Sequence, residues 1–219
     1  YPKCMSFFFS FPNEGIFFGS TPEPLIRLNN KLIETEAIAG TISRGKNMEE
    51  DRLLAEKLQD SHKECEEHRF VLEQILRKLK PLTNQLDYTD YPEILKLKNV
   101  QHLKTPILGE LSSNQHILDL VKQLHPTPAV AGTPTLDAMN IIQELETHGR
   151  GWYSGPLGWV DVNGNGEFFV GLRSALVSDD EAHVFAGGGI VTESIAEREW
   201  DETELKIQPI ITALSGGQI

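Results

Sequence analysis

The sequence has only two cysteines among its 219 residues, Cys4 and Cys65. Two thiols so far apart form neither a disulfide framework nor the ligand spacing of a zinc site. Apolar runs are also short: none approaches the roughly 18 residues that a membrane-spanning helix requires, and no secretory leader is visible. We therefore expect a cytoplasmic protein that has no membrane partner.

Basic side chains are scarce. The chain has 20 Lys and Arg against 32 Asp and Glu, which gives a formal net charge of −12. This excess of negative charge disfavours nucleic acid as a partner, although a small anion can still bind where the local charge is positive. The sequence also lacks a phosphate-binding P-loop, a dinucleotide fingerprint after a strand and a serine-nucleophile motif. Nucleotide and serine-hydrolase chemistry are therefore not predicted.

The sequence contains several patterns typical of β-hairpins. Two Phe-rich runs, residues 7–11 and 16–18, flank turn-forming residues 12–15 and predict a β-hairpin. Both runs are almost continuously apolar, so we expect both faces of this hairpin to be buried. A second short strand pair is predicted around Asn29 and Asn30. Residues 158–162 and 168–172 form a third hairpin across the turn at 163–166, and we expect its second strand to continue to Val177.

Helices are predicted between these hairpins. Asn47, with Glu50 three residues later, caps one long helix that runs to Leu79 and stops before Pro81. Shorter helices are expected over residues 115–124 and 135–146. The order mixes hairpins with helices, and we find no internal repeat. The sequence therefore predicts an α+β (mixed α/β) fold.

A run of three glycines, residues 187–189, follows a strand-like segment. Glycines there let the backbone approach another group closely. Ser194 and Glu197 have the spacing of a capping box, so a helix is expected to begin at this point. Glu199, Glu202 and Lys206 then share one helix face. This arrangement could hold a hard metal ion and an anion together; a tight turn before a solvated charged helix is the alternative.

Two more carboxylates are candidates. Glu67 borders the apolar side of the long helix and could join Glu202 in supplying oxygen ligands to Mg²⁺, which takes one or two carboxylates and keeps several waters. A solvated side chain is the alternative for Glu67. Glu23 lies between Pro22 and Pro24 and could act as a general acid if burial raises its pKa. Its alternative is an ordinary turn residue.

One arginine and two histidines complete the candidates. Arg173 lies among apolar residues of an expected strand, where an inward-facing guanidinium needs an anionic partner. A substrate carboxylate would provide that partner, and so would a structural ion pair. His102 and His125 have the character of hydrogen-bonded structural histidines more than of ligands.

Seven blocks of the sequence resemble those of the chorismate-utilising enzymes and are most similar to the isochorismate synthases. In order, they are residues 19–23, 37–41, 67–68, 125–132, 171–174, 186–191 and 199–203. The resemblance covers nearly the whole chain. It implies antiparallel sheets stacked with helices, as in component I of anthranilate synthase, with the active site in a cleft.

The resemblance also implies roles for individual residues. Glu67 and Glu202 would bind Mg²⁺, with Glu199 beside them, and Glu23 would protonate the departing C4 hydroxyl of chorismate while water adds at C2. The residues implied to bind the substrate, chorismate, are Gly40, Thr41, His102, Ala129, Arg173, Gly187 and Lys206.

Differences within the family favour isochorismate as the product. Ala39 stands where aminodeoxychorismate synthases carry a lysine. Anthranilate and salicylate synthases usually carry a threonine near the position of Ala129. Residues 131–134 read Ala-Gly-Thr-Pro, not the Ser-Gly-Ala-Pro-Lys of anthranilate synthases. We therefore expect an isochorismate synthase of the menaquinone pathway. A siderophore- or salicylate-pathway isochorismate synthase, or a salicylate synthase, is the alternative.

One family feature is missing. The lysine that activates the attacking water precedes the block at 19–23, and Lys3 does not lie in its context. Family members are also about twice as long. We therefore expect residues 1–219 to be the C-terminal portion of one chorismate-binding domain, monomeric and inactive alone. A half that binds Mg²⁺ and chorismate without turnover is the corresponding alternative.

Overall fold

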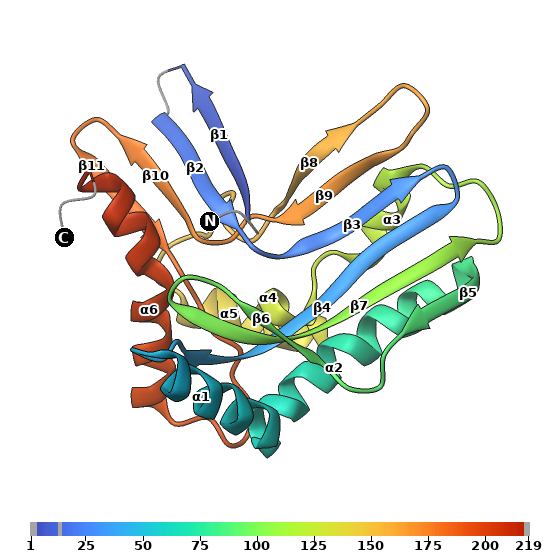
Figure 1. Ribbon diagram of the computed structural model, residues 1–219. Helices are drawn as coiled ribbons and strands as arrows, with labels where there is room; N and C mark the ends of the chain where they lie inside the picture. The colour runs from blue at the N-terminus through green and yellow to red at the C-terminus, as the bar shows by residue number, and fades with distance from the viewer. Residues whose placement is uncertain (1–3, 13–14, 217–219) are drawn as a thin grey trace.

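A computed structural model describes residues 4–12 and 15–216, which form two antiparallel sheets with helices packed around them (Figure 1). The four-stranded sheet has the order β1 (Met5–Phe11), β2 (Gly15–Thr21), β10 (Ser174–Ser178) and β11 (Glu181–Phe185). The seven-stranded sheet has the order β5 (Thr83–Tyr88), β7 (Val100–Leu111), β4 (Leu32–Ser43), β3 (Pro24–Asn29), β9 (Gly166–Val170) and β8 (Pro156–Val160), and β6 (Glu93–Lys96) also pairs with β7. The helices are α1 (Met48–Asp60), α2 (His62–Leu79), α3 (Ile117–Leu124), α4 (Pro128–Ala131), α5 (Thr135–Leu145) and α6 (Ala196–Leu214), with a 3₁₀ turn, η1 (Lys80–Leu82), after α2.

The chain passes between the two sheets twice, from β2 to β3 and from β9 to β10, and the two passages lie side by side. The Thr21 hydroxyl donates to the Val170 carbonyl at 2.6 Å, and the Val170 amide donates to the Glu23 carbonyl at 3.0 Å. The Ser20 amide donates to the Arg173 carbonyl at 3.1 Å. We call these passages, residues 20–23 and 170–173, the seam. The seam holds Glu23 and Arg173 in neighbouring backbone segments.

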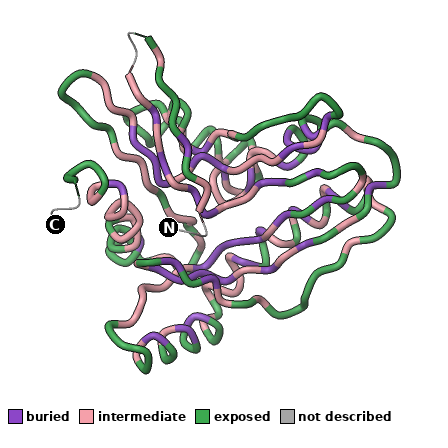
Figure 2. The backbone as a smooth tube through the Cα atoms, turned by 45° about the horizontal axis from the view of Figure 1, so that its top comes forward, coloured by how far each residue is buried: buried purple, intermediate pink, exposed green. Residues whose placement is uncertain are grey.

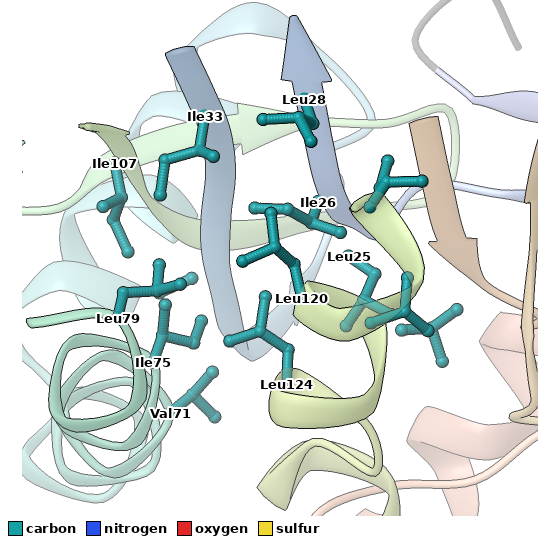
Figure 3. Close-up of a cluster of buried hydrophobic side chains, with 14 of the residues drawn as sticks. Leu25, Ile26, Leu28, Ile33, Val71, Ile75, Leu79, Ile107, Leu120 and Leu124 are labelled. Carbon is teal, nitrogen blue, oxygen red and sulfur yellow. The ribbon is translucent and has the colours of Figure 1, made fainter. Parts of the chain in front are cut away.

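The main hydrophobic core lies between the seven-stranded sheet and helices α2 and α3 (Figure 3). Val71, Ile75 and Leu79 recur along one face of α2 at the spacing of an amphipathic helix, and all three are buried. Leu120 and Leu124 extend from α3 into the same cluster. This packing fixes α2, and with it Glu67, against the sheet. Figure 2 shows the buried backbone concentrated at these internal surfaces.

The predicted single helix over 47–79 is wrong, because two helices meet at Ser61. Asn47 caps α1 as predicted, its side chain accepting from the Glu50 amide at 2.9 Å. The Ser61 amide donates to Leu58 and so closes α1, and the Ser61 hydroxyl accepts from the Glu64 amide and so begins α2. The extended backbone of Ser61 breaks the ladder that an unbroken helix would need.

The first hairpin forms as predicted, with Phe8 opposite Phe18, although turn residues 13 and 14 lie outside the described residues. The prediction that both of its faces are buried is wrong. Phe8 is 65% exposed, because it points to the face of the sheet opposite that of Phe7, which is 8% exposed. On the same strand, Phe11 packs against Trp152, with the ring centroids 4.4 Å apart.

The hairpin near the end of the chain also forms, with Trp159 opposite Glu167. Its second strand does not continue to Val177 as predicted. Strand β9 ends at Val170, and Arg173, with φ +48° in the left-handed region, lies directly before β10 in the other sheet. Strands β5 and β6 were not predicted, since their sequence is polar with little alternation.

The α+β class with antiparallel sheets is confirmed. Both cysteines are free, as the sequence indicated. Among the described residues, no helix is long and apolar enough to cross a membrane.

Candidate active site

A cavity of about 780 Å³ lies where the seam, the seven-stranded sheet, α2, α5 and α6 meet. Eight of the predicted site residues line it: Glu23, Thr41, Glu67, His102, Ala129, Arg173, Gly187 and Lys206. Gly40, Glu199 and Glu202 do not line the cavity but adjoin residues that do. One side of the cavity is apolar, formed by residues such as Phe70 and Ile142. The structure thus gathers side chains from distant parts of the sequence around one space.

The glycine triplet lies directly against the acidic residues, which is the kind of close backbone approach that glycines allow. A Cβ placed on Gly189 would lie 2.7 Å from Oε1 of Glu67. A Cβ on Gly188 would lie 3.5 Å from Oε2 of Glu199 and 3.8 Å from Oε1 of Glu202. A side chain at Gly189 would therefore displace the Glu67 carboxylate, and the close approach requires glycine.

Helix α6 presents its acidic face toward the triplet without the predicted capping box. Ile195, not Ser194, is the N-cap, and it makes no side-chain capping bond. The Ser194 hydroxyl instead accepts from the Val191 amide at 3.1 Å. Helix α6 thus begins later than the pattern indicated, while the expected helix face is retained.

Lys206 links that face to the glycine backbone. Its Nζ lies 2.6 Å from Oε1 of Glu202 and donates to the Gly187 carbonyl at 3.1 Å. The side chain also lines the cavity. Lys206 is therefore available to an anion in the cavity while it fixes the position of Glu202.

Two further residues, Lys63 and Glu64, were not predicted as site residues. Lys63 Nζ lies 2.6 Å from Oε1 of Glu199 and 3.2 Å from Oε1 of Glu64. Oε2 of Glu64 accepts from the Thr41 amide at 2.8 Å. Glu64 lies one turn before Glu67 on α2, and that spacing was the available signal. Together these residues connect α2, α6 and β4 behind the cavity.

Glu67 lies in an environment that favours a cation. The pKa of Glu67 is raised to about 7, first by burial and then by the nearby Glu64 and Glu202 carboxylates, against the lowering effect of Lys206 and Lys63. Within residues 4–12 and 15–216, no group of three or more His, Cys, Asp or Glu side chains is arranged to hold a metal. Mg²⁺ needs only one or two carboxylates, so Glu67 and Glu202 fit its requirements.

Glu23 lies at the seam, where its surroundings favour the protonated carboxyl. Its amide donates to the Thr21 hydroxyl at 3.3 Å, which fixes the backbone. Burial raises the pKa of Glu23 to about 7, although the nearby Lys206, Thr127 and Arg173 side chains all act to lower it. A carboxyl with this pKa carries a proton for part of the time at neutral pH, as a general acid must.

The Arg173 guanidinium contacts the imidazole ring of His102. The Arg173 side chain is buried at 7% exposure, and its Nη2 lies 3.0 Å from Nε2 of His102. His102 contacts the Gly40 carbonyl and the Thr41 hydroxyl through Nδ1. Gly40 has φ +73° at the irregular register between β4 and β7, so its carbonyl is turned toward His102. His125, in contrast, is half-buried and lies outside the cavity lining.

Tyr153 was not predicted at all. It lines the cavity, and its hydroxyl lies 3.0 Å from the position of a Cβ on Gly187. Its ring stacks on Phe185, with 5.4 Å between centroids, and burial raises the pKa of its hydroxyl to about 12. Nothing in the local sequence distinguished this tyrosine from a core aromatic. The structure therefore adds a protonated hydroxyl to the cavity wall.

The chain matches known proteins over nearly its full length. The family described as "Chorismate binding enzyme" matches residues 1–215. Isochorismate synthase MenF of Bacillus subtilis (strain 168) is 41% identical over 96% of this chain and 45% of its own length. The salicylate biosynthesis isochorismate synthase of Pseudomonas aeruginosa is 44% identical over 91% of this chain and 42% of its own length.

A solved structure agrees with these relatives. The crystal structure of a putative 2,3-dihydroxybenzoate-specific isochorismate synthase, DhbC from Bacillus anthracis, superimposes with a TM-score of 0.91 at 36% identity. The superposition covers 96% of this chain and 58% of the solved chain. The chain thus spans about half the length of the curated relatives that it matches.

Proposed function

Because the chain belongs to the chorismate-binding enzyme family, we propose that the protein of which it is part converts chorismate to isochorismate. The observation that carries this proposal is the content of one cavity: a general acid at the seam, a buried arginine and an acidic cluster beside a glycine triplet. Chorismate is a dicarboxylate whose reaction needs a proton for a leaving hydroxyl, so an acid and anion-binding groups must meet at one site.

Glu23 donates the proton to the C4 hydroxyl, which leaves as water while another water adds at C2. The pKa of Glu23 near 7, raised by burial, supports this role. Arg173 and Lys206 bind the substrate carboxylates, together with the backbone at Gly187, because both side chains line the cavity. The attacking water must also lose a proton, and the family resemblance assigns that step to a lysine that precedes residue 19.

Mg²⁺ is the cofactor that the site would hold. Glu67 and Glu202 would bind the ion, with Glu199 acting through water. Two features support this: the raised pKa of Glu67 among neighbouring carboxylates, and a glycine backbone that leaves room beside them. When bound, the ion neutralises the substrate's ring carboxylate.

Product analysis tests the reaction. The full-length protein is incubated with chorismate and Mg²⁺, and we expect isochorismate as the product. Salicylate with pyruvate would overturn the proposal in favour of a lyase, and no conversion would overturn it as well. Glu23→Gln serves as the matched variant: turnover should fall by at least about 100-fold, while Mg²⁺-dependent chorismate binding persists.

The pathway and the half-chain alternative need separate tests. Relatives named for the menaquinone-specific MenF and for salicylate biosynthesis match this chain at similar identity. We favour the menaquinone route, and growth complementation of menaquinone- and salicylate-deficient strains by the full-length protein distinguishes the two. The 219-residue chain alone should bind chorismate with Mg²⁺ and form no isochorismate; turnover by it would place the base within these residues.

A further inference from the structure

The contact between Arg173 and His102 fixes the proton positions of the histidine. Arg173 Nη2 and His102 Nε2 are 3.0 Å apart, within hydrogen-bond distance. A guanidinium donates hydrogen bonds and accepts none. Nε2 of His102 must therefore be the acceptor, and it carries no proton.

The other ring nitrogen must then carry the proton, because a neutral imidazole has one N–H. Nδ1 lies 3.2 Å from the Gly40 carbonyl oxygen and 3.1 Å from the Thr41 hydroxyl oxygen. The carbonyl can only accept, so an Nδ1–H satisfies it. The positive φ of Gly40 aims this carbonyl at the ring. Both sides of the ring thus specify the same tautomer.

The surroundings of His102 oppose protonation. His102 is 5% exposed, and burial lowers its pKa well below the usual value. The positive charges of Arg173 and Lys206 lower the pKa further, and the hydrogen bond to Gly40 opposes them only in part. A charged imidazolium would also lose the acceptor that holds Arg173. His102 is therefore unsuited to transfer protons near neutral pH.

We propose that His102 is a positioning residue, held as the neutral Nδ1–H tautomer, whose Nε2 orients the Arg173 guanidinium toward the cavity. That the oriented guanidinium receives a chorismate carboxylate rests on the proposed function. The tautomer of His102 and its contact with Arg173 do not depend on that function.

Nitrogen NMR of the full chain labelled with ¹⁵N-histidine tests the tautomer directly. The resonances of His102 are identified by their loss in His102→Gln. We expect the pattern of a protonated Nδ1 and an unprotonated Nε2, unchanged from pH 5 to pH 9. An Nε2–H pattern, or a titration near pH 6.5, would overturn the proposal. This measurement needs no turnover, so it stands whether or not chorismate is the substrate.

Kinetics of the full-length protein test the positioning role. His102→Leu removes the acceptor, and we expect KM for chorismate to rise at least tenfold while kcat changes less than threefold. His102→Gln keeps an acceptor oxygen and a donor NH₂, so it should recover most of the lost affinity. His183→Gln, an exposed substitution on β11, is the control. Equal losses in the Leu and Gln variants, or a loss confined to kcat, would overturn the role.

Discussion

At the scale of single residues, the chemistry depends on side chains whose neighbours are far away in the sequence. The sequence identified Glu23 from its flanking prolines, but its raised pKa depends on burial, which outweighs the lowering effect of Lys206. Lys63 and Tyr153 were missed for the same reason, since neither lies in a local pattern and their contacts come from α6 and from the glycine triplet. Candidate residues could be chosen from the sequence, whereas the burial and charge around them could not be predicted.

Glu23 should make stability depend on pH. Its folded-state pKa of about 7 exceeds the ordinary 4.5, so the folded state binds the proton more tightly than the unfolded state. The resulting stabilisation is complete below pH 4.5 and is lost as the pH rises toward 7. Glu23→Gln should therefore be more stable than the parent at pH 8, by up to about 3 kcal/mol, and by much less at pH 4.5. Urea unfolding at both pH values measures this difference.

Glu197→Gln, an exposed substitution in the first turn of α6, is the control for this comparison. It should leave the pH dependence unchanged. If Glu23→Gln destabilises the protein equally at both pH values, the carboxyl is not buried at a cost, and its assignment as a protonated acid loses its physical basis.

At the scale of elements, one local pattern gave opposite results at two positions. Ser194 and Glu197 fit a capping box, but helix α6 begins at Ala196 without it. Ser61 and Glu64 have the same spacing, and Ser61 does begin α2, at a point where the continuous apolar pattern had indicated an unbroken helix. Turn signals were more dependable, because the Asn-Gly pairs set the local turn that joins β8 to β9, and β9 then also pairs with β3.

A substitution in the glycine triplet tests whether this segment contributes to cation binding. Gly189→Ala introduces a Cβ that would lie 2.7 Å from Oε1 of Glu67, so the carboxylate must move. We expect Mg²⁺ affinity, measured by titration calorimetry with chorismate present, to fall at least about tenfold, or 1.4 kcal/mol. Gly149→Ala is the matched control, because no atom lies within 4 Å of the added Cβ. Equal affinity in both variants would show that the triplet has no part in cation binding.

At the scale of the whole molecule, the arrangement of sheets could not be predicted from sequence. Strand β2 pairs with β10, so residues 16–19 lie against residues 174–177. No local periodicity encodes such a pairing, and the second passage between the sheets contains Arg173 in the left-handed region. The family resemblance supplied the stacking of sheets and helices that residue patterns alone did not.

The cation proposal also predicts a response of the whole fold. Mg²⁺ that binds the folded state should raise Tm, and at 100 times Kd the stabilisation is about 2.7 kcal/mol. Protons compete for Glu67, whose pKa is about 7, so the increase should be large at pH 8 and small at pH 5. Calorimetric scans with and without Mg²⁺ measure it. Glu202→Gln should abolish the increase, and Glu73→Gln, on the exposed face of α2, should keep it. An increase that survives Glu202→Gln would place the cation elsewhere.

The seam has a mechanical consequence. Glu23 and Arg173 lie where the two sheets separate, on backbone segments tied to each other by the Thr21, Val170 and Ser20 hydrogen bonds. If one sheet rotates relative to the other, the seam is the axis of that rotation, and points on an axis do not move apart. Opening the cavity by such a rotation would therefore leave the Glu23 carboxyl aligned with Arg173.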